Sequence, residues 1–140
     1  MYKIVVTGGR GFIGSHFVEK CLNEGHKVID IDCMTYAASS SLPWDDHPNY
    51  EHINENIKDI THIPMCDIIV NFAAESHVDN SIQTPDVFVD SNVLGVLNIL
   101  NLLRGKVYEC PLLVHISTDE VYGDVLTGEK TEESILEPSN

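Results

Sequence analysis

Three glycines near the N-terminus are spaced as in loops that bind phosphate. The segment TGGRGFIGS, residues 7–15, matches GxGxxG with Gly9, Gly11 and Gly14, and GxxGxxG with Gly8, Gly11 and Gly14. Such glycines allow a tight turn, close approach of the backbone to a pyrophosphate and close packing of the following helix. The free N–H groups at the start of that helix attract phosphate groups. Glycine turns also occur for purely structural reasons, so the motif needs support from its context.

The surrounding sequence gives this support. KIVVT before the glycines predicts a buried strand, the residues after Gly11 predict a helix that ends at Gly25, and KVIDID predicts a second strand that ends at Asp32. An acid at this position binds both ribose hydroxyls and repels a 2′-phosphate, so the pattern predicts an NAD site rather than an NADP site. Arg10 is the exception: its guanidinium could receive a 2′-phosphate, or it could be an exposed loop arginine.

A second polar cluster follows the last predicted strand. HISTDEVYGD places Thr118, Asp119 and Glu120 just after the apolar run 111–117. Ligands of open α/β sheets bind outside the carboxyl ends of the strands, where neighbouring carboxyl groups can divide acid and base roles. The alternative is a polar strand end with two solvated acids. Within the same run, His115 is expected to be a hydrogen-bonded core residue rather than a ligand.

Alternating strands and helices must position these motifs. Further strands are predicted at Tyr50–Ile53, Asp67–Ala73 and Pro111–Ser117. A helix is predicted between the last two of these strands, with Thr84 as its N-cap and Gly105 at its end. The pattern specifies an α/β fold, a Rossmann-type doubly wound parallel sheet. The predicted packing face of the long helix is the apolar stripe Val89, Val93, Val96, Leu100 and Leu103.

Composition excludes several classes of protein. The 140 residues contain 22 acids and 8 lysines and arginines, a net charge of −14, which disfavours nucleic acid or an anionic membrane surface as a partner. The apolar stretch Val87–Leu103 is interrupted by Asp90, Asn92, Asn98 and Asn101, so no membrane span is expected, and no signal peptide pattern is present. The four cysteines are scattered, which disfavours a metal site or disulfides and fits a cytoplasmic protein.

Four segments together resemble one enzyme family. TGGRGFIGS, DCMTYAA (32–38), NFAAESHVDNSI (71–82) and ISTDEVYGD are similar to the nucleotide-sugar 4,6-dehydratases of the extended short-chain dehydrogenase/reductase family, most closely those that act on dTDP-glucose. The resemblance runs along the whole chain. Its most specific element is Thr118-Asp119-Glu120, because related epimerases carry small or hydroxyl residues in place of the two acids.

The resemblance implies an NAD-dependent dehydration of a nucleotide-activated glucose to a 4-keto-6-deoxy sugar, with hydride removed from C4 and returned to C6. It implies that Thr118 bonds the C4 oxygen, Asp119 protonates the departing hydroxyl and Glu120 removes the C5 proton. His77 is an expected substrate contact. The implied cofactor contacts are Gly8, Gly11, Phe12, Ile13, Gly14, Asp32, Thr35, Asn56, Ile57, Ala73, Ala74 and Ser76. The resemblance also implies a homodimer formed partly by the long helix.

The chain departs from the family in three places. Asn56 stands where an aspartate is usual, and Asn80 stands where an arginine follows HVD. None of the five tyrosines has a lysine four residues later, so the YxxxK pair of the family is missing. We therefore expect residues 1–140 to be the NAD-binding domain of a longer enzyme, without its sugar-nucleotide domain and inactive alone.

Two alternatives remain open. A nucleotide-sugar 4-epimerase fits the same chain pattern apart from the two acids. A non-catalytic NAD-binding module fits a protein that needs no tyrosine base. The sequence leaves open whether the nucleotide of the substrate is dTDP or UDP.

Overall fold

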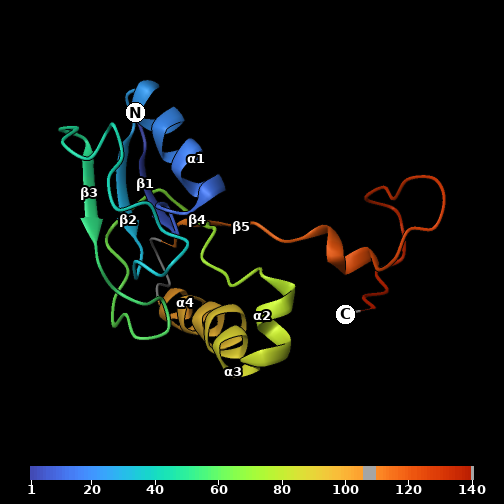
Figure 1. Cartoon of the computed structure of the whole chain (residues 1–140). Coiled ribbons are helices and arrows are strands. Elements are labelled where there is room, and N and C mark those ends of the chain that lie inside the picture. Colours follow the sequence, from blue (N-terminus) through green and yellow to red (C-terminus); the bar gives the residue numbers. More distant parts are fainter. Residues whose placement is uncertain (106–109, 140) are drawn as a thin grey trace.

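The computed structural model describes residues 1–105 and 110–139. Within these residues, five parallel strands form one sheet in the order β3-β2-β1-β4-β5 (Figure 1). The strands are β1 (Lys3–Thr7), β2 (Lys27–Ile31), β3 (Tyr50–Ile53), β4 (Ile68–Asn71) and β5 (Leu112–His115). The chain adds β2 and β3 on one side of β1 and then crosses back to add β4 and β5 on the other. This confirms the predicted Rossmann-type topology.

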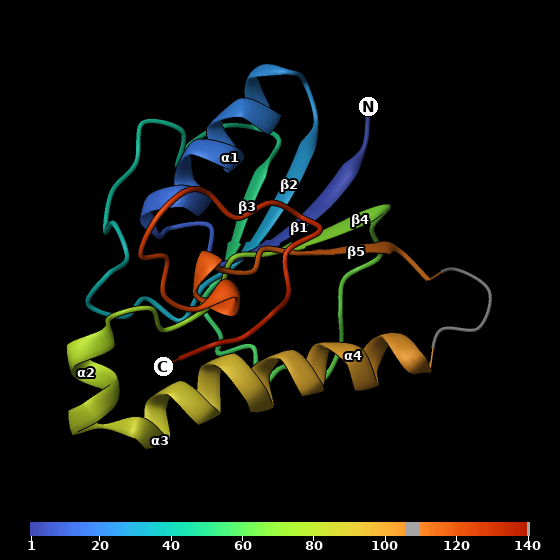
Figure 2. The ribbon, with the colours of Figure 1, turned by 90° about the vertical axis from the view of Figure 1, so that its right-hand side faces the viewer.

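Helices cover both faces of the sheet, as its continuous apolar strands require. Helix α1 (Phe12–Asn23) packs on one face, and the long helical segment that ends in α4 (Val96–Arg104) packs on the other (Figure 1 and Figure 2). Val5 is in register with Ile29 and Ile69, and all three face α4. The residues before and after each of them face the α1 side, because successive side chains of a strand alternate.

The long helical segment differs from its prediction. It consists of α3 (Pro85–Phe88), the π-helical segment η1 (Val89–Gly95) and α4, preceded by the short helix α2 (Val78–Gln83). The buried positions of η1 and α4 are Gly95, Ile99 and Leu103, whereas Val89, Val93 and Leu100 of the predicted stripe are about half exposed. The prediction is confirmed at Leu103, which is buried, and Val96 is half-buried, but it was wrong for the other three residues of the stripe.

The cause of this error is Gly95. A Cβ added there would lie 2.6 Å from the Ile57 side chain, so the helix contacts the core through a residue that an apolar pattern does not count. The π-helical segment η1, which ends at Gly95, also changes which residues face the sheet, because its hydrogen bonds join residues five apart instead of four. The face Gly95–Ile99–Leu103 is consequently buried, whereas Val89, Val93 and Leu100 of the predicted stripe are exposed.

The segment Pro85–Arg104 is long and apolar enough, by length and composition alone, to cross a membrane, although the sequence analysis expected no span. Several of its polar side chains form contacts within this domain. Asp90 forms an ion pair with Lys58, and Asn98 donates to carbonyl groups of the 57–60 turn. These contacts favour a helix docked on the sheet over a helix in a bilayer.

Strand β5 corrects a second prediction. It is the edge strand of the described sheet, and Leu112 is 63% exposed, so Pro111–Ser117 is not the buried strand that its apolar sequence suggested. His115 is also exposed rather than part of the core, although its Nδ1 lies 3.0 Å from Asn71 Nδ2. After β5 the chain runs away from the sheet, as Figure 1 shows in orange and red, and includes only the 3₁₀ turn Asp119–Tyr122 as helix in residues 116–139.

Candidate cofactor cleft

An open cleft lies at the carboxyl ends of β1, β2 and β4. The empty space within it is about 840 Å³, and part of this space is open to solvent. It sits where the chain reverses its direction along the sheet, between β1 and β4, which is the usual ligand position in such sheets. Its lining residues are Gly8, Gly11, Ile31, Asp32, Cys33, Thr35, Ala37, Ala38, Glu55, Asn56, Ile57, Phe72, Ala73, Ala74, Glu75, Val87, Asp90 and Ser91.

The glycine loop forms the cleft wall between β1 and α1. Gly8 has a φ of +72°, and a Cβ there would lie 2.7 Å from the backbone nitrogen of Ala73. A Cβ on Gly14 would collide with the carbonyl oxygen of Gly8. The loop therefore needs glycine both for its conformation and for the close packing of α1. The first turn of α1 has no side-chain cap, so its N–H groups are available to an anion.

Asp32 lies at the end of β2 and is 8% exposed. Its two carboxylate oxygens accept hydrogen bonds from the backbone N–H groups of Arg10, at 3.0 Å, and Met34, at 2.8 Å. These bonds fix the carboxylate at the cleft wall. Each oxygen keeps a lone pair for a further donor such as a ribose hydroxyl.

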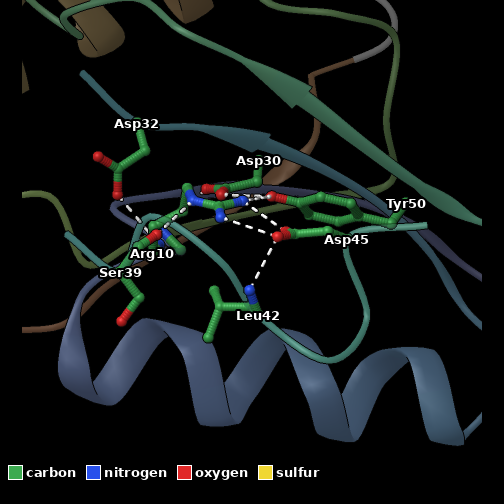
Figure 3. Close-up of polar contacts among 8 residues, drawn as sticks. Arg10, Asp30, Asp32, Ser39, Leu42, Asp45 and Tyr50 are labelled. Atoms are coloured by element: carbon green, nitrogen blue, oxygen red, sulfur yellow. Dashed lines mark hydrogen bonds and ion pairs between the residues drawn. The ribbon is translucent and has the colours of Figure 1, made fainter. Parts of the chain in front are cut away.

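Arg10 contradicts both interpretations made from sequence. It is 4% exposed, so it is not an exposed loop arginine, and it does not line the cleft. Figure 3 shows its guanidinium directed toward Asp45 and Tyr50 instead of Asp32. The shortest contact joins Arg10 Nη1 and an Asp45 oxygen at 2.7 Å, and it holds the pKa of Asp45 below its usual value. The pattern of one glycine motif could not reveal a partner 35 residues away.

Asp30 lies beside this cluster and is fully buried. Its carboxylate accepts a hydrogen bond from the Gly9 N–H at 2.8 Å. It also accepts one from the Tyr50 hydroxyl at 3.0 Å (Figure 3). Burial raises the pKa of Asp30 to about 7. Burial and the neighbouring Asp30 also raise the pKa of Tyr50, so its hydroxyl stays protonated and donates.

The opposite wall of the cleft is the turn after β3. Asn56 Oδ1 accepts from the Lys58 N–H at 2.9 Å, which closes the turn in the way typical of asparagine. Asn98 Nδ2 of α4 donates to the carbonyl oxygens of Ile57 and Ile60, each at 2.9 Å. The helix therefore holds Asn56 and Ile57 at the cleft, where the sequence predicted them.

The third wall follows β4 and contains Ala73, Ala74 and Glu75. Asn92 of η1 forms two hydrogen bonds of 2.8 Å with the backbone N–H and C=O of Glu75, so the π-helical segment fixes this loop. The Tyr36 hydroxyl lies 3.3 Å from the Glu75 carboxylate. The loops after β2 and β4 thus meet at the cleft.

The structure brings together eight of the predicted cofactor contacts in the cleft lining: Gly8, Gly11, Asp32, Thr35, Asn56, Ile57, Ala73 and Ala74. Gly14 lies behind the loop, and the side chains of Phe12 and Ile13 are 83% and 62% exposed at the start of α1. Ser76 and His77 follow the third wall but do not line the cleft. Their roles stay predictions.

The predicted catalytic residues lie outside the cleft lining. Thr118, Asp119 and Glu120 are exposed, and Thr118 caps the 3₁₀ turn by accepting from the Glu120 N–H at 3.2 Å. The pairing of Ile116 with Asn71 does place the start of this segment next to the end of β4. Among the described residues, no contact directs the two acids at the cleft, so their catalytic role also stays a prediction.

Sequence analysis missed some lining residues. Ile31 and Phe72 adjoin strand ends, a position that could have identified them. Val87, Asp90 and Ser91 come from the helical segment and gave no such signal, because their place depends on how that segment docks. The described residues contain no group of three or more histidines, cysteines or acids that could hold a metal ion.

The fold and this cleft define a Rossmann-type nucleotide-binding domain. Residues 5–140 match the family model described as GDP-mannose 4,6 dehydratase, and the chain belongs to that family. It is 41% identical over 144 residues to the low-salt glycan biosynthesis protein Agl12 of Haloferax volcanii, an alignment that covers 98% of this chain and 46% of that protein.

Solved structures agree with this assignment. The dTDP-glucose 4,6-dehydratase DesIV of Streptomyces venezuelae, solved with NAD bound, is 39% identical, with a TM-score of 0.86 over 97% of this chain and 45% of its own. The UDP-Glc/GlcNAc 4-epimerase of Campylobacter jejuni is 25% identical, with a TM-score of 0.84 over 99% of this chain and 44% of its own. The chain thus resembles the dTDP-glucose 4,6-dehydratases, and it spans less than half the length of the curated relatives it matches.

Proposed function

We propose that this chain forms the NAD-binding part of a nucleotide-sugar 4,6-dehydratase. The observation that carries the proposal is the cleft that combines the glycine loop, the uncapped start of α1 and the Asp32 carboxylate at the end of β2. Gly8 and Gly11 line the cleft and carry no side chain, so the backbone there is open to close approach by a pyrophosphate. NAD bound by the relative DesIV supports the choice of cofactor.

The chemistry follows from the family. Bound NAD supplies a hydride acceptor for the sugar C4 and a hydride donor for C6. Within the chain, Thr118 would bond the C4 oxygen, Glu120 would remove the C5 proton, and Asp119 would protonate the leaving hydroxyl. The proton of the C4 hydroxyl would go to a tyrosine base of the YxxxK kind, which none of the five tyrosines of residues 1–140 provides. These residues come just after β5, which is beside β4 in the sheet, and that neighbourhood supports their assignment. The proposed substrate is dTDP- or UDP-glucose.

The decisive experiment is a product assay on the protein at its native full length. A dehydratase converts dTDP-glucose or UDP-glucose into a product that has lost one water, which mass spectrometry detects. An epimerase, which the similarity to the Campylobacter jejuni enzyme keeps as the second candidate, gives an isomer of unchanged mass. Binding of NAD with no turnover of either sugar nucleotide would favour a non-catalytic module.

Glu120→Gln tests the proposed base. In solvent D₂O, the wild-type protein should place deuterium at C5 of the product, and the variant should do so much more slowly. Glu129→Gln, an exposed acid of the same terminal segment, is the matched control. Normal C5 exchange in Glu120→Gln would remove this residue from the mechanism.

We also propose a homodimer in a cytoplasmic setting. Val93, Leu97 and Leu100 of the long helical segment are each about half exposed, which supports a second copy packing there. Light scattering should give twice the protomer mass. Replacing Leu97 and Leu100 with serine should shift the protein toward the monomer, whereas a monomeric wild type would contradict the proposal.

A further inference from the structure

The side chain of Arg10 starts at the cleft but ends away from it. Its backbone N–H bonds the Asp32 carboxylate, so its Cα lies next to the predicted ribose-binding acid. Its guanidinium is held elsewhere, by the Ser39 carbonyl at 2.9 Å, two Asp45 contacts at 2.7 and 3.2 Å, and the Tyr50 hydroxyl at 3.2 Å (Figure 3). All three guanidinium nitrogens of Arg10, Nε, Nη1 and Nη2, therefore donate hydrogen bonds to these partners.

This placement matters for the dinucleotide. An arginine near the ribose is the group that accommodates a 2′-phosphate in NADP sites. A guanidinium binds phosphate well because its planar donors match the phosphate oxygens. Arg10 begins at the right place for that role, and the bidentate contact with Asp45 occupies the donors it would need.

We propose that Asp45 is a specificity-determining residue, which excludes a 2′-phosphate by holding the Arg10 guanidinium away from the cleft. The proposal rests on the proposed function, because it requires the cleft to bind the adenosine ribose of a dinucleotide. Asp32 and Asp45 then act together. Asp32 repels the 2′-phosphate directly, and Asp45 removes the cation that could compensate for that repulsion.

A purely structural role for the pair predicts a different result. The Arg10 side chain is 5% exposed and that of Asp45 is 32% exposed, so the pair also stabilises the loop between β2 and β3. Damage to that loop would weaken NAD and NADP alike. A role in specificity changes the ratio of the two dissociation constants, and this ratio is the quantity to measure.

The experiment uses calorimetric titration of NAD and NADP into the full-length protein. Asp32→Ser provides the background in which direct repulsion is absent. Adding Asp45→Asn should lower the ratio of the NADP to the NAD dissociation constant by about tenfold or more, since the released guanidinium can form charge-assisted hydrogen bonds with the 2′-phosphate. Adding Asp46→Asn instead removes the same charge from the exposed neighbouring residue and should leave the ratio unchanged.

Arg10→Met identifies the cation responsible. Added to Asp32→Ser with Asp45→Asn, it should abolish the gain in NADP binding. Added to Asp32→Ser alone, it should leave the ratio unchanged, because Asp45 already keeps the guanidinium from the cleft. The comparison of Arg10→Met in the Asp32→Ser background needs no Asp45 variant. It can therefore still overturn the proposal if Asp45→Asn fails to fold, which thermal melts would reveal.

Three results would overturn the proposal: equal ratios with Asp45→Asn and Asp46→Asn, a gain that persists without Arg10, or a loss of NADP binding on Arg10→Met while Asp45 is intact. Failure of the proposed function has a different signature. A wild-type protein that binds neither dinucleotide would reject the NAD site itself, and this proposal with it. Tight binding of NAD with any of the three results would reject the proposal about Asp45 alone.

Discussion

The buried Asp30 carboxylate accepts a hydrogen bond of 2.8 Å from the backbone N–H of Gly9, within the glycine loop. The loop of the candidate cofactor cleft is therefore anchored to an acid of β2 that has no exposed surface. Because burial raises the pKa of Asp30 to about 7, this anchor changes its charge near neutral pH.

The first prediction concerns the pH dependence of stability. The pKa of Asp30 rises from 3.8 in the unfolded chain to about 7 in the folded one, so the folded state binds more protons between these pH values. The contribution of Asp30 to stability is therefore greatest at low pH and is lost as the pH rises toward 7. At about 1.4 kcal/mol per pKa unit, this loss is at most about 4 kcal/mol.

Asp30→Asn isolates this contribution, because the amide can accept from Gly9 and cannot ionise. The free energy of unfolding of the variant, relative to the wild type, should increase between pH 5 and pH 8. Urea denaturation at the two pH values measures it. Asp46→Asn, at an exposed position, should show no such increase. An equal difference between Asp30→Asn and wild type at both pH values would contradict the assignment.

The second prediction concerns the Tyr50 hydroxyl, which donates to Asp30 and accepts from Arg10. Tyr50→Phe leaves both of these buried groups with one partner fewer, so it should lower the free energy of unfolding by about 1–3 kcal/mol. Chemical denaturation measures the change. Tyr2→Phe removes a hydroxyl from a tyrosine that is 54% exposed and should have little effect. Equal stability of the two variants would show that the hydroxyl contributes nothing.

The sequence predicted the topology because every strand except β3 is a compact, mainly apolar run, and glycines mark the boundaries of β1, α1 and β2. It failed where packing depends on contacts between distant segments. The buried face of the long helical segment is defined by the approach of Gly95, the last residue of η1, to Ile57, and apolar periodicity does not reveal that contact. The exposure of β5 likewise depends on its position at the sheet edge, since its residues are as apolar as those of the central strands.

The candidate site shows the same division. Gly8 and Asp32 were predictable, because local turn chemistry and the end of a strand determine their positions. The position of the Arg10 guanidinium was not predictable. Its partners Asp45 and Tyr50 lie in a loop and a strand that come close to Arg10 only once the sheet has folded. A motif indicates where a side chain begins, whereas tertiary contacts decide where its charge is held.

The third prediction tests the glycine loop. Gly8→Ala combines a positive φ with a Cβ 2.7 Å from the Ala73 nitrogen, whereas Gly25→Ala shares the positive φ and meets nothing within 4 Å. The conformational penalty of about 1–2 kcal/mol applies to both variants. Gly8→Ala should lose further stability and bind NAD much more weakly, as thermal melts and calorimetry would show. Equal losses in both would mean that the contact with Ala73 has no effect.

The last prediction concerns the polar link between α4 and the cleft. Asn98 Nδ2 donates to the carbonyl oxygens of Ile57 and Ile60, so Asn98→Leu leaves two backbone acceptors without this donor. The free energy of unfolding should fall by about 2 kcal/mol, and NAD binding should weaken because the Asn56–Ile57 wall loses its support. Asn101→Leu, at an exposed position of the same helix, should preserve both stability and affinity. If Asn98→Leu left both unchanged as well, the helix would hold the cleft wall through its apolar contacts alone.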